Sequence, residues 1–435
     1  MKYYPEPNQA PRPNSSHDQN FIGSSTNPSG SDRFTGRLDQ NWSSSHMTQV
    51  SVTRLDNESS STGWLSPLQP VGTTFGTAHT VTANHTWTAT PTMVITGRAG
   101  VMRRTLISGT MVDADAADWN LQREVTTLLG GTKNRVPALN TSDTIADLGG
   151  GSATNEWETT YIGHLSAQKL WGKHTLKFGY EHRRYYSNYV SGGNFAVRSE
   201  RAATSQYYDA PAPTGSPFAG WLLGVVTWGS GTELAGPASL QPYHGAYFQD
   251  DIKLSPKWTV NLGLRWDFEP PRTERFNRQV FWDRNYKWDW QPNPGWSWDK
   301  VLGQAGVPSA PAPEWISKGI YGRAAITGTK EYPSRIFQNS QRDHFGPRVG
   351  LAYQITPQTV MRAGWGINWL TLTGNTFMNG AIWNVGYGGL ARLTQGGTPD
   401  GGLTFPLSFA VPMPGGQGYV PPTRDVDELN PILFI

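Results

Sequence analysis

The 435-residue sequence contains no cysteine, which excludes disulfide bonds, thiolate catalysis and cysteine-ligated zinc. Charged residues are also scarce, at 16% of the chain, below the usual quarter. The formal net charge of +3 is too small to indicate a nucleic acid or an acidic surface as a partner. No apolar run approaches the roughly 20 residues that a membrane-spanning helix needs. A barrel of strands escapes this last test, because only alternate residues of a barrel strand must be apolar.

Motifs for catalysis, cofactors and metals are missing as well. The nine histidines are scattered, and there is no nucleophile elbow, Walker-type loop or dinucleotide fingerprint. Two carboxylate pairs, Asp250-Asp251 and Asp267 with Glu269, have the residue types of glycosidase chemistry. The first pair lies beside a predicted turn, and the second lies on a polar strand face, where charges are common. We therefore expect no enzymatic activity, no cofactor and no metal ion.

The stretch from Tyr243 to Phe268 carries the clearest structural signal. After a turn at Ser255-Pro256-Lys257 the chain alternates with a period of two, which predicts a β-strand with one apolar and one polar face. The apolar face has an aromatic residue near each end, as in strands that face lipid, although a half-buried hairpin of a soluble sandwich fits equally well. The apolar residues are Trp258, Val260, Leu262, Leu264, Trp266 and Phe268, and the polar residues are Thr259, Asn261, Gly263, Arg265, Asp267 and Glu269.

Four further hairpins repeat this pattern. They turn near residues 43–46, 89–92, 171–174 and 356–358, so the sequence predicts about ten strands of an antiparallel up-and-down sheet. If the sheet is a barrel wall, the polar residues that face its lumen include Arg37, Asp39, Arg265, Asp267, Glu269 and Arg348. The strand over residues 243–254 is irregular, because Asp250 shares a face with Phe248 and Ile252. Either a bulge near residues 249–251 or departure of the strand from lipid explains this.

The connections favour an outer-membrane barrel. The turns inside the hairpins have two to four residues, whereas the links between hairpins cover approximately residues 56–76, 105–155, 186–242 and 269–345. Loops beyond about 15 residues are rare in compact soluble domains. Outer-membrane barrels, in contrast, alternate tight periplasmic turns with long extracellular loops. We therefore predict that all five turns lie on one rim and all four links on the other.

Two links contain unusual segments. Residues 218–228, FAGWLLGVVTW, form either a short helix or a strand within a link. The link after Phe268 is rich in tryptophan, and its rings either pack against each other or form a platform for sugars and flat ligands. The candidate ligand-contact aromatics are Trp282, Trp288, Trp290, Trp296 and Trp298.

Four segments resemble the barrel of Oar-like TonB-dependent receptors. They are DRFTGRLDQNWSSSH (32–46), PFAGWLLG (217–224), YFQDDIKLSPKWTVNLGLRWDFEPPRTERFNRQ (247–279) and FGPRVGLAYQITPQTVMRAGWGINW (345–369). The Gln249-Asp250-Asp251 and Gly346-Pro347-Arg348 segments are the most specific part of the resemblance. It implies an outer-membrane receptor of a Gram-negative-type bacterium, in contact with outer-membrane lipid. Such a receptor takes up, or in some cases exports, a large extracellular substrate with energy from a TonB-type complex.

The resemblance also implies segments that this sequence does not contain. Such receptors have a signal peptide, a carboxypeptidase-regulatory-like domain, a plug and a barrel of about 22 strands. We find no secretory signal in MKYYPEPNQAP and no plug or TonB box. We therefore expect an internal fragment that cannot close a barrel alone. Its parts are a loop at 1–31, a partial barrel at 32–370 and a loop-rich part at 371–435. The alternative is a soluble secreted β protein, a propeller or lectin-like module, that binds glycans through its tryptophan-rich loops.

Overall fold

The computed structural model describes the strands of a large sheet and parts of the links between them. The described residues are 4–11, 13, 20–61, 63, 65–66, 68–119, 126, 129, 133–141, 146–191, 194–200, 204–205, 215–223, 228–232, 236–277, 279–287, 297–304, 311, 321–336, 340–370, 390–394 and 419–420.

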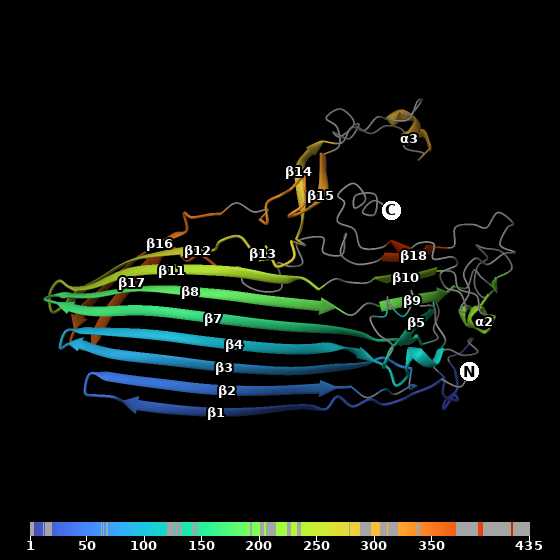
Figure 1. The fold of residues 1–435 in the computed structure, drawn as a ribbon, viewed down its shortest axis with the longest axis horizontal. Coiled ribbons are helices and arrows are strands. Elements are labelled where there is room, and N and C mark those ends of the chain that lie inside the picture. The colour runs from blue at the N-terminus through green and yellow to red at the C-terminus, as the bar shows by residue number, and fades with distance from the viewer. Residues whose placement is uncertain are drawn as a thin grey trace.

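Ten strands form one continuous antiparallel path, which confirms the predicted fold class (Figure 1). An eleventh strand, β13 (Thr273–Glu274), pairs with β11 beside this path. Within the described residues the sheet does not close on itself, so β1 and β17 are its two edges. We call these ten strands the main sheet. In spatial order they are β1 (Ser29–Asn41), β2 (His46–Ser60), β3 (Val71–Thr90), β4 (Met93–Met111), β7 (Ser152–Trp171), β8 (His174–Ser191), β11 (Ala238–Lys253), β12 (Trp258–Phe268), β16 (Phe345–Thr356) and β17 (Thr359–Gly366).

All five hairpin turns lie at one end of the main sheet and all four links lie at the other, as predicted (Figure 1). The strands are longer than their apolar alternation indicates. β2 and β3 remain paired as far as Ser60 and Thr73, so the first link is only residues 61–70 rather than 56–76. Near the links both faces carry polar residues, and backbone pairing continues there without an apolar stripe.

Strands from two links and from the part of the chain after β17 form a second, smaller sheet beyond the ends of the main sheet (Figure 1). Its order is β19-β18-β10-β9-β5-β6, and β5 and β9 pair in parallel. The short helices η1 (Ala116–Trp119) and α2 (Pro217–Leu222) lie in the same links. The strands are β5 (Val136–Thr141), β6 (Leu148–Gly150), β9 (Asn194–Ser199), β10 (Trp228–Thr232), β18 (Leu390–Thr394) and β19 (Tyr419–Val420).

Within residues 218–228, Phe218–Leu222 belong to helix α2 and Trp228 begins β10, whereas residues 224–227 lie outside the described residues. Helix α2 begins at Pro217, whose fixed φ suits the first helical position. The Ser216 hydroxyl accepts a hydrogen bond from the Ala219 N–H at 3.4 Å and caps the helix. Among the described residues, no helix has the length and the apolar character needed to cross a membrane.

The tryptophan-rich link contains a separate hairpin, β14 (Val280–Lys287) with β15 (Tyr321–Ile326), and helix α3 (Trp298–Gln304). Ala325 and Ile326 are fully buried in this hairpin. At the N-terminus, Tyr4 donates a hydrogen bond to the Ala146 carbonyl at 2.8 Å and packs on a core formed by Leu68, Val112, Val136 and Leu148. The links therefore have cores of their own.

The irregular strand has no bulge. β11 pairs with β8 and β12 without a register shift from His244 to Ile252, so the bulge interpretation is wrong. Asp250 does share a face with Phe248, and its carboxylate lies 2.6 Å from Nδ1 of His174, the first residue of β8 after the turn. Asp250 lies directly opposite Leu262 of β12 and Leu176 of β8, so it interrupts the apolar stripe between apolar neighbours.

Candidate functional site

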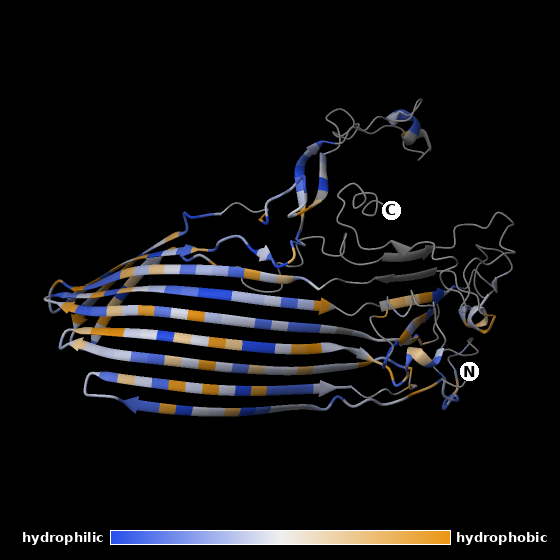
Figure 2. Cartoon of the chain, in the orientation of Figure 1, coloured by the Kyte–Doolittle hydropathy of each residue, from blue (hydrophilic) through white to orange (hydrophobic). Residues whose placement is uncertain are grey.

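The main sheet has one apolar and one polar face, and Figure 2 shows hydrophobic and hydrophilic residues alternating along its strands. The cross-strand registers place the apolar residues of neighbouring strands on the same face, which we call the apolar face. Its side chains are exposed: Leu264 is 48% exposed, Phe248 50% and Trp365 63%. A soluble sandwich would bury this face against a second sheet, so the exposure favours a face that contacts lipid.

The apolar band crosses the strands obliquely. Val50 of β2 aligns with Phe268 of β12 through the successive cross-strand partners Ala83, Ala99, Gly163, His182 and His244. On β2 the apolar residues of this face are Val50 and Val52, so the band is centred at Ser51, which aligns with position 269. On β12 it extends from Trp258 to Phe268 and is centred at Gly263, about six residues closer to the turns. The band therefore moves toward the turns by about one residue per strand.

This slope matches the strand tilt of a membrane barrel. Six residues at about 3.3 Å each give about 20 Å, and six strand spacings at about 4.8 Å give about 29 Å. The resulting tilt is about 35°, within the range of about 35–45° for outer-membrane barrels. A band that stays level in the bilayer while the strands tilt is the arrangement that a barrel wall requires.

Aromatic residues border the apolar band on both sides. The successive cross-strand partners of Trp87 on β3 lead to Leu264 on β12, five strands away. Trp258 lies six residues closer to the turns than Leu264. The two tryptophans are therefore displaced by about one residue per strand, as the apolar band is. Aromatic girdles at both interfaces are typical of outer-membrane barrels. The turn-side girdle is Trp42, Trp87, Trp171 and Trp258, and the link-side girdle is Tyr161, Phe268, Phe345 and Trp369.

The opposite face, the polar face, carries a ladder of ion pairs and hydrogen bonds. The residues predicted to face a lumen lie on this side of the sheet. Glu269 lies just beyond the end of β12 and continues the alternation of Arg265 and Asp267. Arg37 and Asp39 form an ion pair of 2.8 Å on β1, far along the sheet from the others. Arg348 donates to Asn368 Oδ1 at 2.7 Å, and Glu269 accepts from Gln241 Nε2 at 3.1 Å.

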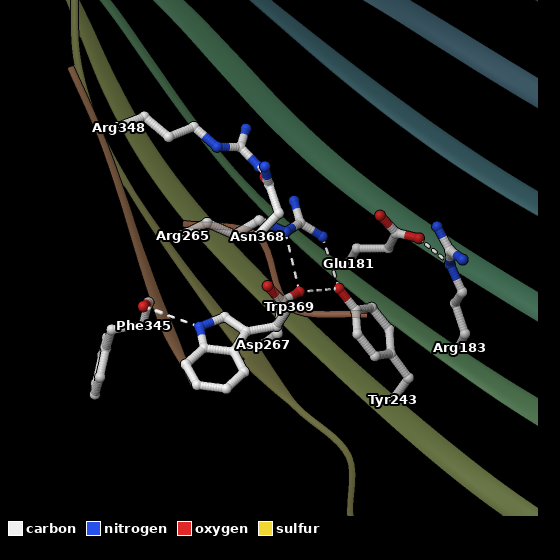
Figure 3. Close-up of polar contacts among 9 residues, drawn as sticks. All are labelled: Glu181, Arg183, Tyr243, Arg265, Asp267, Phe345, Arg348, Asn368 and Trp369. Atoms are coloured by element: carbon white, nitrogen blue, oxygen red, sulfur yellow. Dashed lines mark hydrogen bonds and ion pairs between the residues drawn. The ribbon is translucent and has the colours of Figure 1, made fainter. Parts of the chain in front are cut away.

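The densest part of the ladder is a group of five residues that we call the Tyr243 cluster: Glu181, Arg183, Tyr243, Arg265 and Asp267 (Figure 3). The Tyr243 hydroxyl donates to Asp267 Oδ1 at 2.5 Å and accepts from Arg265 Nη2 at 2.6 Å. Arg265 Nε also donates to Asp267 Oδ1, at 3.0 Å. Tyr243 is 2% exposed and Asp267 6%. The predicted Arg265–Asp267 pair is thus part of a buried, mutually satisfied network.

Two further contacts fix the Tyr243 cluster. The Arg183 guanidinium lies 5.4 Å from the centre of the Tyr243 ring and pairs with Glu181. At Gly245 an added Cβ would lie 2.5 Å from the Tyr243 hydroxyl and 2.9 Å from Arg265 Nη2. The absence of a side chain at Gly245 therefore leaves space for the contact between Tyr243 and Arg265.

Some polar-face contacts could not be identified from the sequence. Arg104 of β4 pairs with Glu156 and Glu158 of β7 at 2.9 and 3.0 Å. These residues are more than fifty positions apart, and only the β4–β7 register brings them together. Tyr243 lies on β11, whose irregular alternation of apolar and polar residues does not reveal from the sequence which face Tyr243 occupies.

Two of the five candidate ligand-contact tryptophans lie in described parts of the link. Trp282, on β14, is 46% exposed, and its indole lies against Gly322 of β15. Trp298 is the first residue of α3. Trp288, Trp290 and Trp296 lie outside the described residues.

The β14–β15 hairpin is held by a buried polar network. Arg323, 2% exposed, pairs with Glu331 and lies 3.7 Å above the Tyr286 ring. The Tyr332 hydroxyl donates to Asp283 at 2.6 Å, and burial together with this hydrogen bond raises the pKa of Tyr332 to about 12. The same hydrogen bond lowers the pKa of Asp283. Among the described residues, no group of three or more histidine or acidic side chains could hold a metal ion.

The chain belongs to the outer membrane beta barrel domain family, whose model matches residues 1–431. The protein is therefore an outer-membrane β-barrel protein, and the soluble secreted alternative is not supported. No curated protein sequence matches the chain.

The chain is also similar in structure to several solved outer-membrane proteins. The copper transporter OprC is 11% identical, with 78% of this chain and 38% of OprC covered and a TM-score of 0.41. The ferric-catecholate import receptor Fiu from E. coli K12 is 11% identical, with 81% and 55% covered and a TM-score of 0.33. The outer membrane transporter YddB from Escherichia coli is 10% identical, with 78% and 40% covered and a TM-score of 0.37. The chain thus spans less than two thirds of the length of each.

Proposed function

We infer that this chain forms part of the barrel wall of an Oar-like TonB-dependent receptor that moves a substrate across the outer membrane. The oblique apolar band with its two aromatic girdles is the observation that carries the membrane orientation. The four sequence segments that resemble Oar-like receptors, and the strands of up to 20 residues, support the receptor class. The barrel portion begins with β1 at Ser29, three residues before the predicted boundary at residue 32, and extends to residue 370.

In this proposal the polar face lines the lumen. Arg37, Asp39, Arg265, Asp267, Glu269 and Arg348 then give the lumen a wet surface on which a plug or a substrate can rest. The Tyr243 cluster is rigid because its hydrogen bonds are satisfied internally, so it acts as a fixed wall rather than a mobile gate. Energy comes from a TonB-type complex acting on the whole receptor, and the protein has no enzymatic role.

The links extend to the cell exterior and make the first contact with an extracellular substrate. Trp282 supports this assignment, because it is exposed on the β14–β15 hairpin. Trp288, Trp290, Trp296 and Trp298 are the other proposed contacts. Aromatic faces of this kind stack on sugars and other flat ligands.

Cysteine labelling tests the orientation. Lys287, at the end of β14 in the tryptophan-rich link, and Lys257, in the hairpin turn between β11 and β12, are both exposed. On intact cells, a membrane-impermeant maleimide should label Lys287→Cys, and Lys257→Cys only after the outer membrane is permeabilised. Labelling of both variants on intact cells would contradict the orientation.

Photo-crosslinking tests the energy source. The product of the native gene, tagged and crosslinked in growing cells, should capture a TonB-type protein, whereas a porin expressed at the same level should not. Correct labelling at Lys287 without this capture would leave the barrel assignment in place and remove the energised transport.

A further inference from the structure

Two arginines lie on the apolar face, where the apolar band meets the link side. Arg103 of β4 is in one cross-strand row with Thr159 of β7 and Tyr186 of β8. Arg184 of β8 is two residues closer to the turns than Tyr186. Since the band also moves by about one residue per strand toward the turns, Arg103 and Arg184 lie at the same membrane depth.

Their depth corresponds to the edge of the hydrocarbon layer. The band is centred near Arg98 on β4, because Ser51 aligns with Gly100 and the band moves about two residues over two strands. Arg103 is five residues further toward the links, about 16 Å along the strand and about 13 Å along the membrane normal at a tilt of about 35°. The apolar band of such barrels is about 25 Å tall, so its edge is about 12–13 Å from the centre. The guanidinium groups therefore reach the lipid headgroups.

A groove runs across the apolar face directly below these arginines. Its volume is about 920 Å³, and its lining includes Arg103 and Arg184. The floor consists of small residues, Ala83, Ala99 and Gly163, which are neighbours in a single cross-strand row. An added Cβ at Gly163 would have no atom within 4 Å, so the groove is open at this point.

The two arginines lack acidic partners, whereas five other arginines of the sheet form ion pairs. Within the part of the chain that the structure describes, neither Arg103 nor Arg184 forms an ion pair. Arg184 donates one hydrogen bond, from Nε to Nε2 of His182 at 3.3 Å, which leaves its terminal nitrogens available. The nearest carboxylate toward the links on this face, Asp56 of β2, already binds Arg54 at 2.6 Å.

We propose that this groove binds a phosphate-bearing lipid of the membrane leaflet on the link side. Its acyl chain lies on the floor of Ala83, Ala99 and Gly163, and its phosphate lies between Arg103 and Arg184. Guanidinium groups bind phosphate oxygens with strong, charge-assisted hydrogen bonds, and the small residues make room for the chain. The site rests on the proposed function only in that the apolar face must contact lipid.

The experiment uses the product of the native gene, extracted from outer membranes in a non-ionic detergent. Dioleoylphosphatidic acid is added to the micelles, and native mass spectrometry counts the lipid that each chain retains. Arg103→Gln with Arg184→Gln should weaken retention by about 30-fold, because each basic residue beside an anionic headgroup contributes about fivefold. Gly163→Leu keeps the charge but fills the groove, and it should also reduce retention.

Matched controls separate this site from general charge effects. Arg98→Gln removes a cation from the polar face of the same strand and should leave retention unchanged. Dioleoylphosphatidylcholine, with a shielded phosphate, and inorganic phosphate, without an acyl chain, should both be retained poorly. Equal retention by the double variant and Arg98→Gln overturns the proposal. So does a protein found at this groove in place of lipid.

The labelling of Lys287→Cys on intact cells is measured in the same variants. Correct labelling with arginine-independent retention overturns the lipid site alone. Failure of the labelling in the otherwise unchanged protein overturns the barrel orientation, and the proposed function with it.

Discussion

The main sheet and the links bury apolar side chains in different ways. Of the hydrophobic residues that are buried in the described parts of the chain, only Ala167 and Tyr243 belong to the main sheet. The others lie in the links and include Phe195, Val197 and Ile326. The links thus form cores as soluble domains do, whereas the main sheet leaves its apolar face open and depends on the bilayer to cover it.

The difference predicts which substitutions depend on lipid. A cavity in a link core remains a cavity in any solvent, because the surrounding protein relaxes only partly. On the apolar face a shortened side chain is replaced by lipid, but an added charge meets hydrocarbon. The same type of residue should therefore respond in opposite ways in the two regions.

The largest effect is expected at Phe195, which is 1% exposed in β9. Phe195→Ala should destabilise the six-stranded sheet by about 3–5 kcal/mol, because it removes a buried ring and leaves a cavity. Hydrogen exchange of the β9 amides in lipid vesicles measures this loss. The matched control is Phe248→Ala on the apolar face, where lipid fills the space and the cost should be much smaller. Equal losses at both positions would contradict the comparison.

A charge on the main sheet should cost somewhat less than that cavity and should depend on the face. Leu264→Arg places a cation near the centre of the apolar band and should destabilise the protein by about 2–4 kcal/mol in denaturant unfolding from vesicles. Gly263→Arg is the control on the polar face, where an added Cβ meets its nearest atom at 3.6 Å. It should be milder, because the lumen is wet. Similar shifts for the two variants would mean that the faces are wrongly assigned.

A smaller effect is expected at the Tyr243 cluster. Gly245→Val places a side chain against the Tyr243 hydroxyl and Arg265, so it should disrupt the cluster and cost about 1–3 kcal/mol through overpacking. Gly163→Val is the control, since it lies on the apolar face with open space around it. Near-ultraviolet circular dichroism reports on Tyr243, and the denaturant midpoint reports on stability. The assignment of Gly245 as space for the cluster fails if the two variants behave alike.

The sequence predicts the main sheet well because its signal is local. Alternation along residues 258–268 identifies both faces of β12, and the short turns identify the rim on which they lie. The alternation predicts link-side ends of β2 and β3 that are several residues short, because backbone pairing continues where both faces are polar and the alternation disappears. The bulge proposed for residues 249–251 is absent because β11 keeps one register with both neighbours, and the Asp250 carboxylate lies on the apolar face beside His174.

The candidate site was predicted only where its residues are neighbours in sequence. Arg265 with Asp267 and Arg37 with Asp39 lie two positions apart, so alternation alone places each pair on one face. Arg104 with Glu156, or Tyr243 with Asp267, requires knowledge of the register between strands. The same holds for the groove between Arg103 and Arg184, since its floor combines residues from three strands.

The smallest predicted effect is a titration in the β14–β15 hairpin. Tyr332 has a pKa raised from 10.0 to about 12 in the folded protein, so folding favours its neutral form. The resulting stability is complete below pH 10 and is lost as the pH rises through about 12. We therefore expect the hairpin to loosen in that range, because a Tyr332 phenolate beside the Asp283 carboxylate replaces a hydrogen bond with repulsion between like charges. The gain is small, since Tyr332 is only partly buried and water screens the charge.

Tyrosinate absorbance of the protein in vesicles, measured with and without Tyr332→Phe, isolates this group. The difference should titrate near pH 12, and proteolysis within the link should increase over the same range in the unchanged protein only. Tyr321→Phe is the control, because Tyr321 is an exposed residue of the same hairpin that lies 5.8 Å from Lys287 Nζ and makes no contact with Asp283 among the described interactions. A difference that titrates near pH 10 would show that Tyr332 does not hold Asp283 in the membrane-bound protein. The main sheet should not respond over this range, because its stability depends on lipid covering the apolar face rather than on the Tyr332–Asp283 contact.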